Sequence, residues 1–67
     1  MMRLSAREQE ILEHLAEGRT AKDIAGALLI TTRAVERHMA TMRLTMRARN
    51  TTHMISRGFL SGALPVD

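Results

Sequence analysis

The sequence predicts an all-α fold, a four-helix bundle built around a central helix-turn-helix. Apolar residues recur at the three- and four-residue spacing of helices, and no stretch alternates as a strand would. Each of four segments starts at a residue that commonly caps a helix and continues with apolar residues at helical spacing. A chain of 67 residues holds a single small domain, 1–67, and at this length it needs close packing between its helices.

The first two helices are expected near residues 5–17 and 20–28. Their starts have the pattern of a capping box, in which a hydroxyl and an acidic side chain three residues later each accept a hydrogen bond from the other residue's backbone. The pairs are Ser5 with Glu8 and, more weakly, Thr20 with Asp23. The first helix also has a stop signal, because Gly18 suits the left-handed residue that follows a helix end.

The third helix is expected near residues 31–46, with Thr31 as its cap, after a turn made of Leu29 and Ile30. At about 100° per residue, its apolar residues fall in one narrow stripe. They are Val35, Met39, Met42 and Met46. The opposite side carries Arg33, Arg37, Ala40 and Arg47, with Glu36 and Arg43 at its flank and Leu44 also pointing outward. This helix is therefore expected to bury one face and to expose long hydrogen-bond donors on the other.

The fourth helix is expected near residues 50–58, from Asn50 as its cap to Gly58 as its stop. Its apolar face is supplied by Met54, Ile55 and Phe59. Residues 61–67 combine small residues with a proline and show no periodicity, so we expect a flexible tail there.

Composition excludes several classes of protein. The chain has no cysteine, which excludes disulfides and thiolate metal sites. It has no pattern of a signal peptide and no apolar run long enough to cross a bilayer, so we expect a soluble protein of the reducing cytoplasm. The histidines have no metal-ligand spacing, and no glycine-rich phosphate loop or catalytic pair of carboxylates occurs. We expect no enzyme activity, no metal and no cofactor.

The net charge of +3 is unevenly distributed. Residues 1–29 hold four basic and five acidic residues, whereas residues 30–67 hold six arginines and two acidic residues. The planar fork of arginine suits phosphate oxygens and guanine edges. Two short helices joined by a tight turn, the second longer and basic, are typical of a helix-turn-helix that places its second helix in the major groove of DNA. The pattern by itself leaves open an ordinary solvated helix face.

Four groups of residues match one known pattern, in order and without gaps. They are Leu4, Ser5, Arg7 and Glu8; Ala16 and Gly18; Lys22, Ile24 and Ala25; and Val35 and His38. On these residues the chain from Leu4 to Leu60 resembles the LuxR/FixJ-type (GerE-like) helix-turn-helix domain of bacterial transcription regulators. That domain belongs to the winged-helix-like superfamily but has no wing.

The resemblance implies a transcription regulator that binds double-stranded DNA sequence-specifically and acts as a homodimer, with no small-molecule ligand and no membrane partner. It puts Lys22, Thr31 and His38 at the phosphate backbone, Glu36, Arg37 and Ala40 at base edges, and Arg43 near the flanking phosphates. It puts His53, Met54 and Arg57 on the dimerisation face of the fourth helix. The outward position of Arg33 adds this residue to the candidate base readers.

Some residues depart from the family pattern. Leu29 stands where glycine is usual, at a cost of roughly 1–2 kcal/mol if the backbone there is left-handed. Ala34 replaces a threonine, Glu36 a frequent lysine, and Arg47 the glycine that closes the third helix. These changes leave open a protein-binding module that keeps the fold and blocks a larger regulator or contacts RNA polymerase. Most family members carry an N-terminal sensing domain, and the start at Met1 favours a stand-alone protein over an excised domain.

Overall fold

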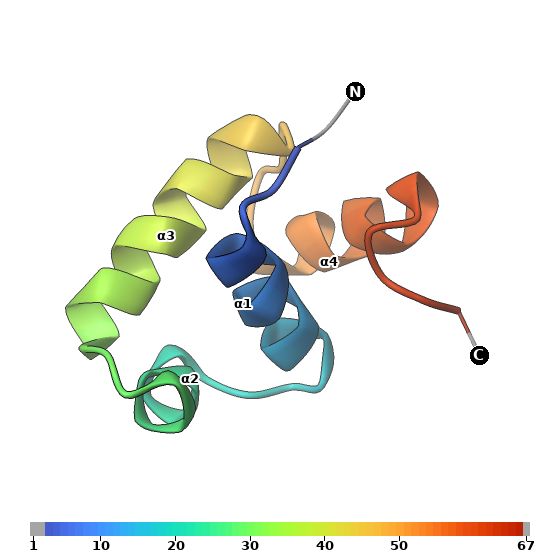
Figure 1. Cartoon of the computed structure of the whole chain (residues 1–67). Helices are drawn as coiled ribbons and strands as arrows, with labels where there is room; N and C mark the ends of the chain where they lie inside the picture. The colour runs from blue at the N-terminus through green and yellow to red at the C-terminus, as the bar shows by residue number, and fades with distance from the viewer. Residues whose placement is uncertain (1–2, 67) are drawn as a thin grey trace.

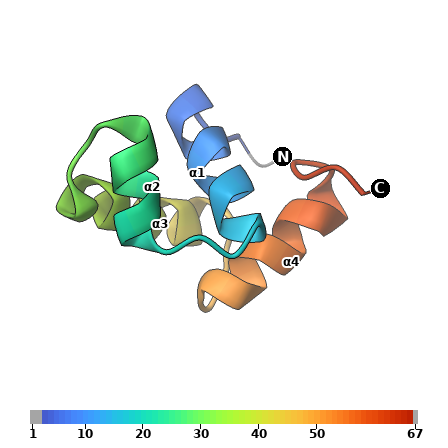
Figure 2. The ribbon, with the colours of Figure 1, turned by 90° about the horizontal axis from the view of Figure 1, so that it is seen from below.

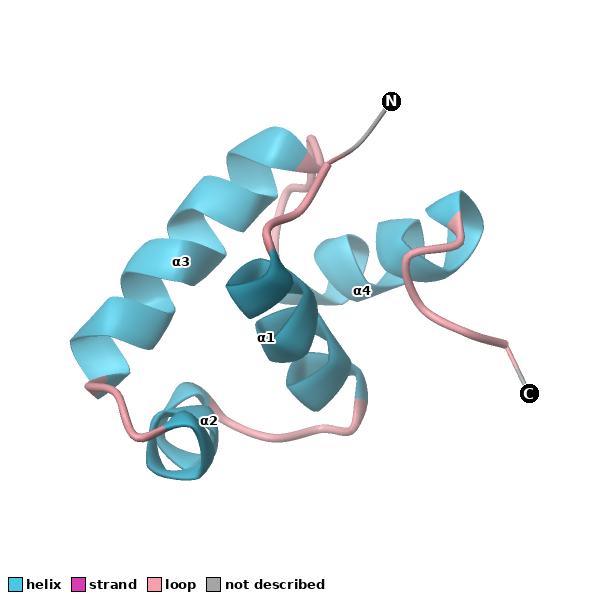
Figure 3. Ribbon diagram, in the orientation of Figure 1, coloured by secondary structure: helices cyan, strands magenta, loops and turns pink. Residues whose placement is uncertain are grey.

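A computed structural model of the chain, described for residues 3–66, contains four helices joined by short loops (Figures 1 and 3). The helices are α1 (Ala6–Ala16), α2 (Ala21–Leu28), α3 (Thr32–Thr45) and α4 (Thr51–Ser61). No strand occurs among these described residues, so the predicted all-α class is confirmed. None of the four helices is long and apolar enough to span a membrane.

The helices are arranged around α1. It lies between α3 on one side and α4 on the other, and α2 lies beside the N-terminal end of α3 (Figures 1 and 2). The outward side of α3 is therefore left without a covering helix.

All four helices begin where the sequence placed their caps, at Ser5, Thr20, Thr31 and Asn50. Each cap residue has an extended backbone, and its side-chain oxygen accepts a hydrogen bond from the N–H three residues later. In α1 and α2 the capping box is complete, because Ser5 N–H donates to Glu8 Oε1 (2.9 Å) and Thr20 N–H donates to Asp23 Oδ2 (3.0 Å). These bonds occupy N–H groups near the helix start, where the first turn lacks backbone partners, so short-range chemistry fixes the helix starts.

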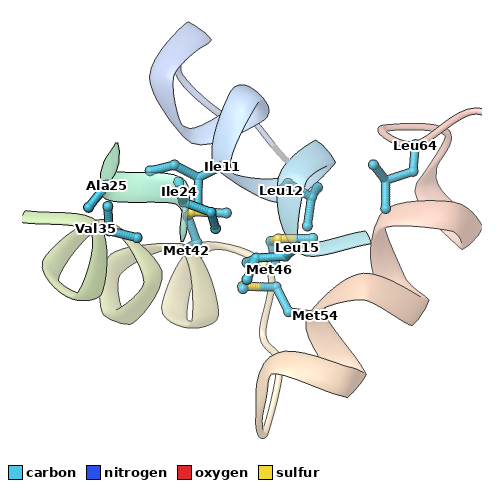
Figure 4. Packing of buried hydrophobic residues seen from close by; sticks show 10 residues of the cluster. All are labelled: Ile11, Leu12, Leu15, Ile24, Ala25, Val35, Met42, Met46, Met54 and Leu64. Carbon is cyan, nitrogen blue, oxygen red and sulfur yellow. The ribbon is translucent and has the colours of Figure 1, made fainter. Parts of the chain in front are cut away.

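The core is formed by apolar residues from all four helices and from the chain after α4 (Figure 4). They are Ile11, Leu12, Leu15, Ile24, Ala25, Val35, Met42, Met46, Met54 and Leu64. Three members of the predicted α3 stripe belong to this core, whereas Met39 is only partly buried against it. The flexible thioether of methionine suits the irregular space where helices cross.

The predicted end of α4 at Gly58 is wrong. The helix continues to Ser61, and the left-handed residue that ends it is Gly62 (φ 84°). Gly58 is instead buried, and a Cβ atom there would lie 2.8 Å from Leu64 Cδ1 and 3.2 Å from Leu12 Cδ2. This glycine permits the close approach of α4 to α1 and to the chain end, a use that its sequence position does not distinguish from a stop signal.

The structure also corrects the expectation of a flexible tail over residues 61–67. Leu64 is 3% exposed and belongs to the core. Its backbone N–H donates to the Gly58 carbonyl (3.0 Å), and Gln9 Nε2 donates to the Ala63 carbonyl (2.7 Å). A buried leucine and two hydrogen bonds thus hold the chain as far as residue 64, while the last residue of the range lies outside the described residues.

Candidate nucleic-acid interface

The helix-turn-helix formed by α2, the turn and α3 positions the candidate site. Ile24 and Ala25 of α2 lie beside Val35 of α3 in the core (Figure 4). In the turn, the backbone N–H of Ile30 donates to the Ala25 carbonyl (3.1 Å). Leu29 has a left-handed backbone (φ 57°, ψ 41°), the conformation for which glycine is usual, so the steric cost anticipated for leucine there is present.

We define the outward face of α3 as its exposed residues on the side opposite the core. They are Arg33, Glu36, Arg37, Ala40, Thr41, Leu44 and Thr45. This face brings together four of the residues that the sequence assigned to DNA contact: Arg33, Glu36, Arg37 and Ala40. The other two assigned residues of the helix, His38 and Arg43, are half-buried at its edges. The helix thus separates an apolar side from a side rich in arginine.

Among residues 3–66, no carboxylate forms an ion pair with a cation of the outward face. Within residues 3–66, ion pairs join Arg7 to Glu10 (3.9 Å) and Arg19 to Glu17 (3.1 Å), both in the N-terminal half of the chain. Neither pair involves α3, so Glu36 does not hold a neighbouring arginine in a fixed pose. Uncompensated positive charge is what attraction to a phosphate backbone requires.

The N-terminal ends of α2 and α3, both assigned to phosphate contact, differ in the hydrogen-bond donors that they leave free. Lys22 is exposed in the first turn of α2, and Thr31 is exposed as the cap of α3. The hydroxyl oxygen of Thr31 accepts from the Ala34 N–H (3.0 Å), so its own proton remains available to a phosphate oxygen. At α2, by contrast, Asp23 already occupies the N–H of the cap residue.

The Asp23 carboxyl is stabilised in its ionised form. Hydrogen bonds from the backbone N–H and then the hydroxyl of Thr20 are the main reason that the pKa of Asp23 lies below its ordinary value of 3.8, and the charges of Lys22 and Arg19 add to this effect. A fixed negative charge therefore lies beside Lys22 at the start of α2.

The structure corrects the assignment of Met54 to a dimer contact. Its side chain is 0% exposed in the core of its own chain, from which it cannot reach a partner. The other two assigned residues make internal contacts: His53 Nδ1 accepts from the Arg49 N–H (3.0 Å), and Arg57 Nε donates to the Met46 carbonyl at the end of α3. Both tie α4 to the chain that precedes it.

Sequence reasoning missed Leu60 of α4, which is 84% exposed, and it placed the 40% exposed Phe59 on the buried face. The signal was present in the helical spacing. Leu60 follows Met54 by six residues, which at about 100° per residue places the two on different sides of α4.

Comparisons with known proteins agree with this geometry. Residues 2–57 match the family described as bacterial regulatory proteins, luxR family. The transcriptional activator protein BjaR1 of Bradyrhizobium diazoefficiens is 37% identical over 54 residues, which are 81% of this chain and 22% of that protein. The chain therefore spans about a fifth of the length of this curated relative.

Two solved structures have the same fold. The transcription factor GerE superposes with a TM-score of 0.89 at 26% identity, covering 96% of each chain. A Vibrio cholera VqmA–ligand–DNA complex superposes with a TM-score of 0.90 at 28% identity, covering 100% of this chain and 29% of the other.

Proposed function

The chain belongs to the luxR family of bacterial regulatory proteins, and on that premise we propose that it regulates transcription by binding double-stranded DNA with α3 in the major groove. The observation that carries the proposal is the outward face of α3, where Arg33 and Arg37 are exposed and form no ion pair with a carboxylate of residues 3–66. The major groove admits one helix and displays the code that distinguishes base pairs.

Phosphate and base contacts have different roles on this surface. Lys22, Thr31, His38 and Arg43 meet phosphates, which position the domain and make its affinity depend on salt. Arg37, with Arg33, donates to guanine edges, and Glu36 accepts from a cytosine amino group. The small side chain of Ala40 also lies against a base edge. Glu36 thus acts as a base reader in place of the lysine that is frequent in the family.

The proposed complex contains two copies of the chain, joined through α4. Exposed Phe59 and Leu60 supply the apolar contact that buried Met54 cannot. The proposed function places the domain in the cytoplasm with the bacterial chromosome. The alternative function is a protein-binding module that keeps this fold. Its partners would be RNA polymerase or a larger regulator.

The test begins with selection of the preferred duplex from a random pool. Dissociation constants for this duplex and an unrelated one are then measured at several salt concentrations, for the wild type, Arg37→Ala and the control Arg7→Ala, which removes the same charge from α1. Arg37→Ala is expected to lose about 10- to 100-fold in affinity for the selected duplex and little for the unrelated one. A flat salt response, or equal losses by both variants, rejects recognition through α3.

A further inference from the structure

The outward face of α3 changes character along the helix. Its first half carries Arg33, Glu36 and Arg37, whereas its second half has no charged residue, because Arg43 is half-buried at the edge. The second half consists of Ala40, Thr41, Leu44 and Thr45. Leu44 is 83% exposed at the centre of this second half. A single exposed leucine is common on protein surfaces, so the inference depends on the neighbours of Leu44 and on its alignment with the arginines.

The two threonines beside Leu44 use their hydroxyls on the helix itself. Thr41 Oγ1 donates to the Arg37 carbonyl (3.3 Å), and Thr45 Oγ1 donates to the Thr41 carbonyl (3.1 Å). Each hydroxyl proton is used within the helix, so these side chains offer a partner no hydrogen-bond donor, only a methyl group and an acceptor oxygen. With Ala40 and Leu44 they form a surface of methyl groups without a free donor, which we call the methyl surface.

The methyl surface continues the line of the arginines. At about 100° per residue, Arg33, Arg37, Ala40 and Leu44 project within a sector of about 60°. Leu44 follows Arg37 by seven residues, which is about 10 Å along the helix. Since base pairs are spaced by about 3.4 Å along the duplex axis, and the groove is inclined to that axis, this length spans at most about three base pairs. A helix that brings Arg37 to a base edge and lies along the groove brings Leu44 to another.

Apolar chemistry is scarce in the major groove. Among the ordinary bases, only thymine presents an apolar group there, its 5-methyl group, and apolar side chains contact it. A 5-methylcytosine would present the same group. We propose that the methyl surface of α3, centred on Leu44, reads the 5-methyl group of a pyrimidine within about three base pairs of the base that Arg37 reads. This assignment rests on the proposed DNA-binding function.

The experiment removes one methyl group at a time from the selected duplex. Each thymine is replaced by deoxyuridine, which differs only by that group, and the dissociation constants of the wild type, Leu44→Ala and Val66→Ala are measured. Val66 is a matched control, because it is nearly as exposed as Leu44 (79% against 83%) but lies outside all four helices. Thermal unfolding of both variants verifies that they fold. At the same position, cytosine and 5-methylcytosine are then compared.

We expect the wild type and Val66→Ala to lose about fourfold in affinity when deoxyuridine replaces a thymine within about three base pairs of the guanine that Arg37 reads. We expect Leu44→Ala to bind both duplexes equally. If the wild type prefers 5-methylcytosine over cytosine, the contact is to the methyl group on either pyrimidine. If it shows no such preference, the contact is specific to thymine.

Two results overturn the proposal, and they differ from failure of the function itself. A wild type that binds its selected duplex but is insensitive to every deoxyuridine shows that no methyl group is read. A Leu44→Ala variant that keeps the sensitivity shows that Leu44 is not the reader. A wild type that binds no duplex fails before this comparison is made and rejects the proposed function as well.

Discussion

At the scale of single residues, two positions have a left-handed backbone that disfavours the side chains they carry. Leu29 has a left-handed backbone and is 91% exposed, so its side chain contributes little burial against its steric cost. Arg47 is the second non-glycine residue with positive φ (53°) among the described residues, and it too stands where the family pattern has glycine. The chain thus has a left-handed backbone at both turns without the glycine that suits this conformation.

Replacing Leu29 by glycine is expected to stabilise the domain by about 1 kcal/mol, because the clash between Cβ and the backbone disappears. For a domain of this size, this corresponds to a rise in Tm of about 4–8 °C. Leu29→Ala is the matched control, since it removes the same exposed side chain but keeps Cβ. Thermal unfolding followed by circular dichroism compares the two, and an equal gain by alanine contradicts the backbone explanation.

At the scale of elements, local caps fix the starts of the helices, whereas tertiary contacts decide where α4 ends. Asp23 and Thr20 hold the start of α2 through reciprocal hydrogen bonds of 3.0 and 3.1 Å. The end of α4 depends instead on Gly58, whose missing side chain makes room for Leu64. The cap of α2 therefore gives a prediction that depends on pH, and Gly58 gives one that depends on side-chain volume.

The cap of α2 is expected to weaken in acid. Because the pKa of Asp23 lies below its ordinary value of 3.8 in the folded chain, the carboxyl stabilises the fold above that value. This contribution is lost as the pH falls through the lower, folded pKa. Urea unfolding measures the free energy of unfolding at about pH 7 and at about pH 3. Between these two pH values, Asp23→Asn is expected to lose less stability than the wild type. The control Glu36→Gln, which removes an exposed carboxyl without a partner, should lose as much as the wild type.

The two helical glycines are expected to respond oppositely to alanine. At Gly58 the new Cβ would overlap Leu64 and press on Leu12, so we expect Gly58→Ala to destabilise the domain by about 1–2 kcal/mol. At Gly26 no atom lies within 4 Å of a new Cβ, and the higher helix propensity of alanine should stabilise by about 0.5–1 kcal/mol. Denaturant titrations measure both changes, and a gain of stability at both positions would refute the packing role of Gly58.

At the scale of the whole molecule, size and charge shape the proposed interaction with DNA. The domain measures 28 × 26 × 20 Å, less than the roughly 34–36 Å between successive turns of a DNA groove. In the proposed complex, one copy is therefore expected to read one half-site, and a second copy another on the same side of the duplex. Helix α3 lies on the opposite side of α1 from α4 (Figure 1), which leaves α4 available for a partner copy in the proposed complex.

Sedimentation of the protein with the selected duplex is expected to give complexes that contain two chains. Leu60→Asp should shift them to one chain per duplex, because a charge would replace the exposed apolar contact on α4. Val66→Asp, a similar change at an exposed residue outside α4, is the control and should leave two chains. Wild-type complexes with one chain at every protein concentration would exclude the dimer. Met54→Asp is unsuitable for this purpose, since it places a charge in the core.

The sequence by itself determined the all-α class, the four caps and the division of α3 into buried and outward faces. These properties depend on residues within one or two helical turns of each other, whose bonds and spacing the chain carries directly. Only the tertiary structure decided that Met54 is buried, that Gly58 is a packing position and that Leu64 completes the core. Each of these depends on which distant segment approaches: Leu12 of α1 and Leu64 meet at Gly58, and Arg57 reaches the end of α3. Local spacing identifies an apolar residue or a glycine, but the segment packed against it decides its role.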